Sequence, residues 1–406
     1  MRFREIVAEA AEGKNLHLEH IEDLVFLQGK SGASSALQYI NSVRDMLEHG
    51  KPSGSSITVK WDGAPAIFAG VDPSDGKFFV STKSVFTQDA KLVKQPSDLA
   101  QFNEGPREKL AVAFKHLRNL GIQGVLQGDL MYTKAMLDSE EVDGEDSWIF
   151  QPNTITYAVP KDSKLGKQIS ASDMGIIFHT TYNGPSLPDM TASFGADVSE
   201  LKPSTAVWYD DASYKDLSGS ASLTPTENTK IMRALNAAAA ALKTADFDAV
   251  SGDYKKLIMQ YVNSRIRAGT EQVADPQQFV QDFSAWYKAY VEKDIAKLKN
   301  QSPDAPAVKA RRDKIQAQNE FMQQNIKGIV SALAVYQDII AMKNMLIEKL
   351  NKVDSIKTLI RTDTGYDVTN PEGFVAIGSE GGAVKLVARL QFSKNNFNAV
   401  KNWKKG

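Results

Sequence analysis

Cysteine is absent from the 406-residue chain, which excludes disulfides, thiolate metal sites and cysteine nucleophiles. A chain without cysteine suits a reducing compartment. Long uncharged apolar runs are also missing, so no stretch of the sequence predicts a membrane span. The first residues, Met1 to Glu5, carry charges where a signal peptide needs an apolar run. We therefore expect a soluble, intracellular protein of the cytoplasm that does not enter a membrane.

An excess of charge of either sign is lacking too. The formal net charge is −1, which excludes a polycation, so any contact with nucleic acid must use local basic patches. Apolar residues make up 42% of the chain, enough to form a buried core. With roughly 100–200 residues per domain, the length predicts two or three domains.

The spacing of apolar residues predicts an α+β fold. Helical spacing occurs over residues 3–10, 34–49 and 106–121. Strand-like alternation and turn residues predict strands or short apolar runs at 56–61, 66–69, 77–82, 124–130, 155–159 and 175–181. Residues 183–223 are rich in Gly, Pro, Ser and Asp, which predicts a loop with an irregular strand at 207–209.

A block of helices interrupts this pattern. Thr224-Pro225-Thr226-Glu227 is typical of a capped helix start. From there to Val353 only helices are predicted, including one long pattern over 308–352, and strands return at 373–377 and 383–390. The block has 130 residues, enough for a domain of its own. We therefore predict a discontinuous α+β domain, residues 1–223 plus 354–406, interrupted by an all-α domain at 224–353.

The chemically sharpest pattern is Val59-Lys60-Trp61-Asp62-Gly63, where a predicted strand leads into a turn. A lysine amine is a nucleophile only after it loses its proton, and burial, neighbouring cations or a metal ion lower its pKa. Gly63 would let the backbone approach a bulky ligand. Taken alone, the pattern is better explained as a surface strand that ends in an ordinary Asp-Gly turn.

Five further segments follow this pattern on strands or strand ends. They are Ser81 to Ser84, Leu126 to Leu130, Ile176 to Thr180, Pro371 to Val375 and Val384 to Val387. In kind and order the series resembles the motifs of the covalent nucleotidyltransferase superfamily, which contains ATP-dependent DNA ligases, RNA ligases and mRNA capping enzymes. The resemblance covers roughly residues 55–182 and 356–390. It implies a ligase-like nucleotidyltransferase domain with antiparallel sheets.

The resemblance assigns roles around the nucleotide. It implies that Lys60 attacks the α-phosphorus of ATP, releases pyrophosphate and holds AMP as a phosphoramidate. Asp62 and Gly63 complete the motif beside the nucleotide. Phe178 matches the aromatic residue that stacks on the base, and Lys385 matches the lysine that contacts the α-phosphate.

The same resemblance implies a magnesium ion. Glu372 resembles the acid that binds the catalytic metal, and Asp129 stands where the family usually has Glu, near the ribose or the metal. Lys83 stands where the family more often has Arg, near the ribose or the polynucleotide phosphate. Carboxylates together with phosphate oxygens suit Mg²⁺, and lysines with a metal ion neutralise the charge of phosphoryl transfer.

Three departures from the family pattern favour its RNA ligase branch, within which the chain resembles the phage type. Pro65 and Ala66 lie where many DNA ligases have Arg, and Val387 replaces the second lysine of the last motif. Only 21 residues follow Lys385, too few for the oligonucleotide-binding barrel of DNA ligases and capping enzymes.

We therefore predict an ATP-dependent RNA ligase. AMP would pass from Lys60 to a 5′-phosphate end, and a 3′-hydroxyl would then displace it. The first alternative is a DNA ligase acting on nicks, and a capping-type guanylyltransferase is disfavoured because no barrel follows. An alternative of another class is a non-catalytic nucleic-acid-binding protein with a decayed nucleotidyltransferase fold, for which Val387 is the best support. The implied partner is nucleic acid with 5′-phosphate ends, RNA rather than DNA.

Two groups of polar residues near these motifs have a simpler explanation. His17, Glu19, His20, Glu22 and Asp23 could supply a metal site through the two histidines, but we interpret them as a solvated helix face. His179 follows the predicted stacking residue, and we expect it to point to the opposite face of the strand from the nucleotide.

Basic residues gather at two further places. Those of the helical block between Lys293 and Lys314 could hold a polynucleotide, although a solvated helix face is the better explanation. The tail after Lys385 interleaves basic and aromatic residues, as a single-stranded nucleic-acid track does. A frayed terminus explains the tail equally well.

Overall fold

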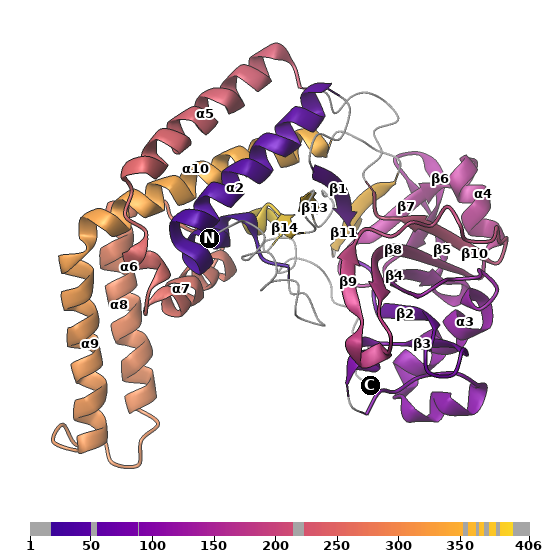
Figure 1. Ribbon diagram of the computed structural model, residues 1–406, viewed down its shortest axis with the longest axis horizontal. Coiled ribbons are helices and arrows are strands. Elements are labelled where there is room, and N and C mark those ends of the chain that lie inside the picture. Colours follow the sequence, from indigo (N-terminus) through magenta and orange to yellow (C-terminus); the bar gives the residue numbers. More distant parts are fainter. Residues whose placement is uncertain are drawn as a thin grey trace.

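The computed structural model describes residues 18–49, 55–87, 89–213, 223–351, 356–362, 365–368, 373–378 and 382–392. Most of the helices gather on one side of the molecule and the two larger sheets lie on the other, with a small sheet between them (Figure 1). Helices and mostly antiparallel strands are thus combined in one chain, which confirms the α+β class. The predicted helix at residues 3–10 lies outside the described residues.

The largest sheet has six strands. Its order is β10-β8-β4-β2-β3, with β9 paired to β8, and only the β8–β10 pair is parallel. A helix, α3 (Glu104–Leu117), packs Leu110 and Phe114 into the core on one face of this sheet. The strands are β2 (Ala66–Val71), β3 (Phe78–Ser81), β4 (Val125–Thr133), β8 (Met174–Asn183), β9 (Thr191–Phe194) and β10 (Val207–Asp211).

The second sheet has five antiparallel strands in the order β12-β11-β7-β6-β5. Helix α4 (Lys164–Ala171), capped by the Ser163 hydroxyl, lies against it. The strands are β5 (Asp138–Val142), β6 (Glu145–Phe150), β7 (Thr156–Pro160), β11 (Lys357–Thr362) and β12 (Gly365–Val368). Strands β5 and β6 were not expected, because charged residues such as Glu140, Glu141 and Glu145 hide the alternation in their sequence.

The small sheet joins the two ends of the chain. Strand β1 (Ser55–Lys60) pairs antiparallel with β13 (Gly373–Gly378), which pairs antiparallel with β14 (Ala383–Leu386). The predicted strand at 383–390 therefore ends early, and residues 389–392 are helical.

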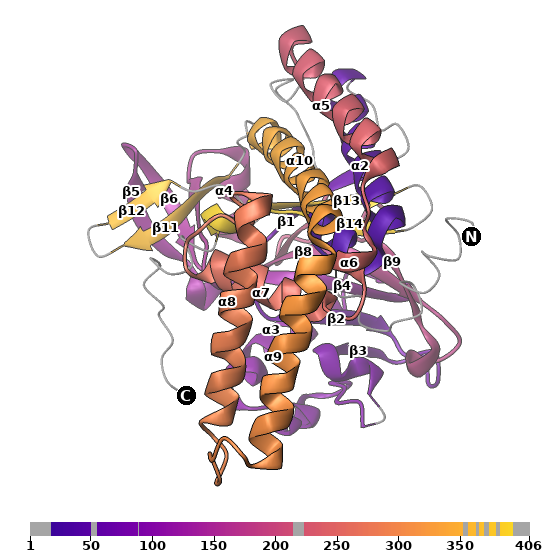
Figure 2. The same ribbon diagram turned by 90° about the vertical axis from the view of Figure 1, so that its left-hand side faces the viewer.

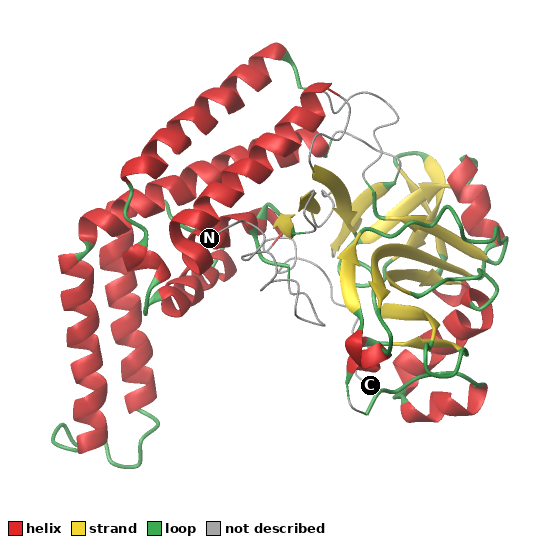
Figure 3. Cartoon of the chain, in the orientation of Figure 1, coloured by secondary structure: helices red, strands yellow, loops and turns green. Residues whose placement is uncertain are grey.

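The helical side consists of α2 (Leu24–His49), α5 (Pro225–Thr244), α6 (Asp248–Ser251), α7 (Lys255–Arg267), α8 (Pro276–Ile295), α9 (Pro306–Gln324) and α10 (Ile326–Leu350). Figure 3 shows how these helices stand apart from the larger sheets. The capped start at Thr224 is confirmed, because its hydroxyl accepts from Glu227 N–H while the Glu227 carboxylate accepts from Thr224 N–H. The long pattern over 308–352 is two helices, α9 and α10, with a break at Asn325.

One hydrophobic core unites the helices with the small sheet. Its buried side chains include Ile40 of α2, Ile339 of α10, and Phe374 and Leu386 of the small sheet. The segment at 24–49 therefore packs on α5 and α10 rather than on the larger sheets (Figure 1). The division into domains at 1–223 plus 354–406 and at 224–353 stays a prediction.

Helix α10 is the one described helix long and apolar enough to cross a membrane, by length and composition only. Half of its most apolar window is buried inside the protein. The residues that make it apolar, such as Leu333, Ile339 and Leu346, are fully buried in the shared core. This is the composition of a central helix in a globular protein, and Leu and Met side chains of this helix pack in the core.

Candidate active site

The register of the small sheet brings Lys60 and Lys385 to the same face. Thr58 pairs with Val375, and Val375 pairs with Lys385. Directly paired residues share a face, as do residues two apart in a strand. Lys60, two residues after Thr58, therefore lies on the face that carries Lys385. Two lysines 325 positions apart in the chain are thus brought to one surface.

This face borders a cavity of about 290 Å³. Three lysines and one aspartate among the predicted site residues line it, namely Lys60, Lys83, Asp129 and Lys385. The volume is at the lower end of the range for small-molecule pockets, roughly 300–1,000 Å³. An excess of ammonium groups over carboxylates suits an anionic ligand such as a phosphate chain.

Asp62 holds the turn after the lysine rather than lining the cavity. It is 5% exposed, and its carboxylate accepts from Asn153 Nδ2 and from the backbone N–H groups of Thr154 and Ile155, each at 2.7 Å. Burial raises the pKa of Asp62, although these hydrogen bonds and the charge of Lys60 act the other way. The Asp62 N–H donates to the Tyr157 hydroxyl at 2.8 Å. Asp62 thereby ties the end of β1 to β7.

Gly63 is required by close packing. A Cβ atom added there would lie 2.6 Å from Asp129 Cβ and 3.0 Å from the Leu130 carbonyl oxygen. Only glycine lets the turn pass this close to β4. Asp129 pairs with Ala66 on one side and with Ile177 on the other, so it lies in the middle of the six-stranded sheet. The turn at Gly63 therefore sets the separation between Lys60 and the Asp129 strand.

The expected orientations at β8 are reversed. Phe178 is fully buried in the core beneath the sheet, packed with residues such as Ile67 and Leu110, and it does not border the cavity. Its neighbour His179 does, with Nε2 3.7 Å from Asp129 Oδ1 and Nδ1 2.8 Å from Thr180 Oγ1. Since alternate residues of a strand face opposite sides, His179 lines the cavity and Phe178 does not.

The structure describes one of the two predicted metal ligands, Asp129. The Asp129 carboxylate borders the cavity. Glu372 lies outside the described residues, as does His17. A group of Asp45, Glu48 and His49 elsewhere could in principle hold a metal ion, but Arg44 already pairs with both carboxylates.

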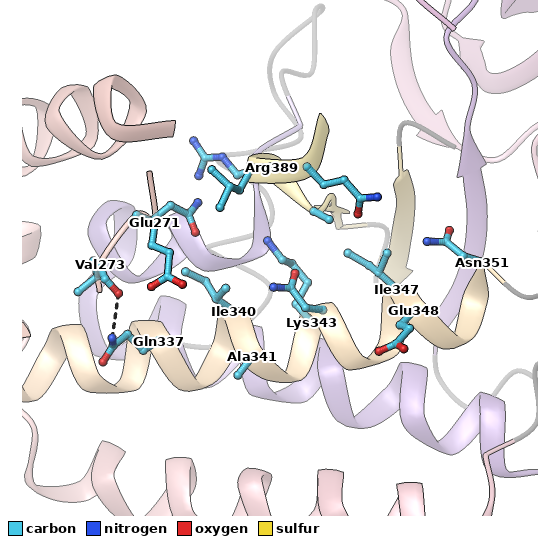
Figure 4. Close-up of a pocket in the computed structure, with 15 residues that line it drawn as sticks. Glu271, Val273, Gln337, Ile340, Ala341, Lys343, Ile347, Glu348, Asn351 and Arg389 are labelled. Carbon is cyan, nitrogen blue, oxygen red and sulfur yellow. Dashed lines mark hydrogen bonds between the residues drawn. The ribbon is translucent and has the colours of Figure 1, made fainter. Parts of the chain in front are cut away.

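A second cavity, of about 930 Å³, lies between α10 and the segment after β14 (Figure 4). Lys343 projects from α10 toward this segment, which carries Arg389 (Figure 4). Both cations bind the same buried carboxylate: Lys343 Nζ lies 2.8 Å and Arg389 3.5 Å from Glu22 Oε1. Arg389 also pairs with Asp23 at 2.9 Å.

The sequence pattern predicted a solvated helix face for Glu22 and Asp23, and this prediction is wrong. Glu22 is 0% and Asp23 4% exposed. Burial acts to raise the pKa of Glu22, but Lys343 and Arg389 hold it below its usual range. Burial, followed by the charge of Arg389, lowers the pKa of His20 to about 3. Glu22, Asp23, Lys343 and Arg389 thus form a largely buried network in which the charges balance, beside the neutral His20 imidazole. Arg389, at the start of the basic tail, is part of it.

Comparison with known proteins places the chain in a family but adds no activity. Residues 15–401 match the model of a family described as a family of unknown function (DUF6267). No curated protein and no solved structure matches the chain.

Proposed function

The chain belongs to a family of unknown function (DUF6267), and from its own residues we propose an activity. It is an ATP-dependent RNA ligase that acts through a covalent Lys60–AMP intermediate. The observation that carries this proposal is the convergence of Lys60, Lys83, Asp129 and Lys385 on one cavity. These residues come from separate motifs of the resemblance, and nothing in their local sequence requires them to meet.

The first step forms a bond between Lys60 Nζ and the α-phosphorus of ATP, while the bond to the pyrophosphate oxygen breaks. The amine must be neutral to attack, and its proton leaves as the bond forms. Lys385 and Lys83 border the same cavity and would neutralise charge on the phosphate oxygens. Asp129, with Glu372, would hold Mg²⁺, which supplies further neutralisation of the phosphate charge when bound.

The second step transfers AMP to a 5′-phosphate end and restores the free lysine. In the third step a 3′-hydroxyl attacks that phosphate, and AMP leaves. The ring that contacts the adenine in this scheme is His179, because Phe178 is enclosed in the core.

The position of Val387 bears on the alternative of a decayed, non-catalytic fold. Val387 is 3% exposed and packs against Gly373, where an added Cβ would lie 2.7 Å from Val387 Cγ2. A lysine at this position would place a charge in the core. An apolar residue therefore fits this buried position, and the missing second lysine does not by itself argue for a decayed site.

The test is covalent labelling. The protein is incubated with Mg²⁺ and α-labelled ATP or α-labelled GTP, denatured and run on a gel. We expect label from ATP, none from GTP, and none in Lys60→Ala. The matched control is Lys77→Ala, an exposed lysine in the turn between β2 and β3, which should label like the parent.

The outcomes separate the alternatives. Label from GTP alone would point to a capping-type enzyme, and no label from either nucleotide would favour the binding protein. Label that persists in Lys60→Ala would sink the assignment of the nucleophile. A chase of the adduct with 5′-phosphorylated single-stranded RNA or with nicked DNA then distinguishes an RNA ligase from a DNA ligase.

A further inference from the structure

Helices α8 and α9 form an antiparallel hairpin that projects from the helical side (Figures 1 and 2). Its register is set by contacts along its length. Gln318 Nε2 donates to Ser284 Oγ at 3.3 Å near the base, and Arg311 pairs with Asp294 at 2.7 Å near the tip. The outer half of the hairpin, residues 286–314, is called the arm below.

A row of aromatic rings runs along α8 and reaches solvent on the arm. The rings are Phe279, Phe283, Trp286 and Tyr290, spaced four, three and four residues apart, which keeps them on one side of the helix. Successive rings are nearly parallel, with interplanar angles of 7°, 23° and 22°.

Tyr290 is the outermost ring of this row. It is 49% exposed, more than any other large hydrophobic side chain among the described residues. Trp286 supports its inner side, with the ring centroids 5.5 Å apart. Because Trp286 already stacks on Tyr290, the exposed Tyr290 ring is held in place and offers a flat surface to a ligand.

The arm is basic within an almost neutral protein. It contains eight Lys and Arg against four Asp and Glu, a net charge of +4, whereas the whole chain has −1. Arg311 and Arg312 pair with acids of α8. The exposed Lys293 lies three residues beyond Tyr290, on the same side of α8.

Two more lysines lie close to this point. The Arg311 hydrogen bond, with smaller effects of Lys297 and Lys314, holds the pKa of Asp294 below its usual range. Both lysines are therefore near Asp294, about one helical turn beyond Tyr290, and both are exposed. Lys293, Lys297 and Lys314 thus lie on the arm between Tyr290 and the tip or beside that stretch.

We propose that the arm binds single-stranded nucleic acid by stacking a base on Tyr290 while Lys293, Lys297 and Lys314 contact the adjoining phosphates. A stacking ring beside cations is what single strands require, because every unpaired base has a flat face and every linkage a negative charge. A duplex offers no free base face along its length. A protein partner that covered Tyr290 would have to bury these lysines as well. The surface is separate from the Lys60 cavity, so the proposal stands apart from the chemistry proposed there.

The test is the fluorescence anisotropy of labelled 12-nucleotide single strands, RNA and DNA, with the full-length protein and no ATP. We expect Tyr290→Ala to weaken binding about tenfold, since stacking on one ring is worth about that factor. Tyr290→Phe keeps the ring and should bind within about twofold of the parent. Comparing the affinities for the RNA and the DNA strand shows whether the sugar contributes to binding.

The charge contribution is tested separately. Lys293→Ala combined with Lys314→Ala should reduce the slope of log affinity against log salt by about 1.4, at about 0.7 per phosphate contact. The matched control is Lys288→Ala, an exposed lysine on the opposite side of α8, which should leave binding and slope unchanged. Equal binding by the parent and Tyr290→Ala, stronger binding to a duplex than to single strands, or an equal loss in Lys288→Ala would each overturn the proposal.

Discussion

Two charged regions flank β14, and they are built in opposite ways. On one side Lys385 borders a cavity with Lys60, Lys83 and Asp129, where cations outnumber carboxylates. On the other side, four residues later in the chain, Arg389 enters a network with Glu22, Asp23 and Lys343 in which charges balance and every member is largely buried.

The comparison shows how the same residue types serve two purposes. A buried charge needs a partner inside the protein, since removing it from water costs several kcal/mol. The network around Glu22 meets that need and links α10 to the end of β14. Around the smaller cavity the lining lysines outnumber the lining carboxylates, which suits an anionic ligand. The 930 Å³ cavity, whose cations Lys343 and Arg389 pair with buried acids, is therefore the less suited of the two to an anionic ligand.

The largest expected effect comes from breaking the buried network. Lys343→Met would leave Glu22 buried with less compensation, and we expect the free energy of unfolding to fall by about 3–5 kcal/mol in urea titrations. Lys327→Met, at an exposed position in the first turn of α10, should change it by less than about 0.5 kcal/mol.

The double variant Glu22→Gln/Lys343→Met sharpens this result. It removes both charges, so most of the lost stability should return. A loss in the double variant as large as that in Lys343→Met would show that packing, not the charge of Glu22, is what Lys343 provides.

The reverse behaviour is expected at Lys385. Lys385→Met should lower covalent labelling from ATP by about a hundredfold, because a cation aimed at the reacting phosphate stabilises the transition state. Its free energy of unfolding should change by less than about 1 kcal/mol, since the side chain borders a cavity instead of filling a core. Unaltered labelling together with a large loss of stability would make the two regions alike and remove the contrast.

Asp62 belongs to the lysine motif, but like Glu22 it is buried and has its hydrogen-bond partners inside the protein. Asp62→Asn would replace one of two accepting oxygens by an N–H₂ group, which would face either Asn153 Nδ2 or the backbone N–H donors of Thr154 and Ile155. We expect a loss of about 1–3 kcal/mol in unfolding free energy, with labelling reduced because the end of β1 shifts. A variant of full stability that no longer labels would instead assign Asp62 a direct role with the nucleotide.

A pH dependence is expected from His20. Its folded pKa of about 3 lies below the ordinary value of 6.5, so the unfolded chain binds a proton that the folded protein does not. Stability from this group is complete above pH 6.5 and falls as the pH drops toward 3, by about 1.4 kcal/mol per pH unit. The difference in unfolding free energy between the parent and His20→Asn should change with this slope.

Much of the local structure could be predicted because it depends on short-range rules. The Thr224 cap, the strand that ends at Lys60 and the core role of α10 all follow from spacing and capping residues. The break at Asn325 was missed because helical periodicity continues across it. Strands β5 and β6 were missed because their exposed positions are charged.

Which side chains share a site depends on long-range contacts that sequence spacing does not contain. The amino-acid sequence alone placed Lys60, Lys83, Asp129 and Lys385 at strands and strand ends, and it specified residue types suited to phosphate chemistry. It could not tell Phe178 from His179, since both faces of β8 are possible until α3 covers one of them. Nor could it show that Glu22 meets Lys343, 321 positions later, because only the packing of α10 against the first helices excludes water from that pair.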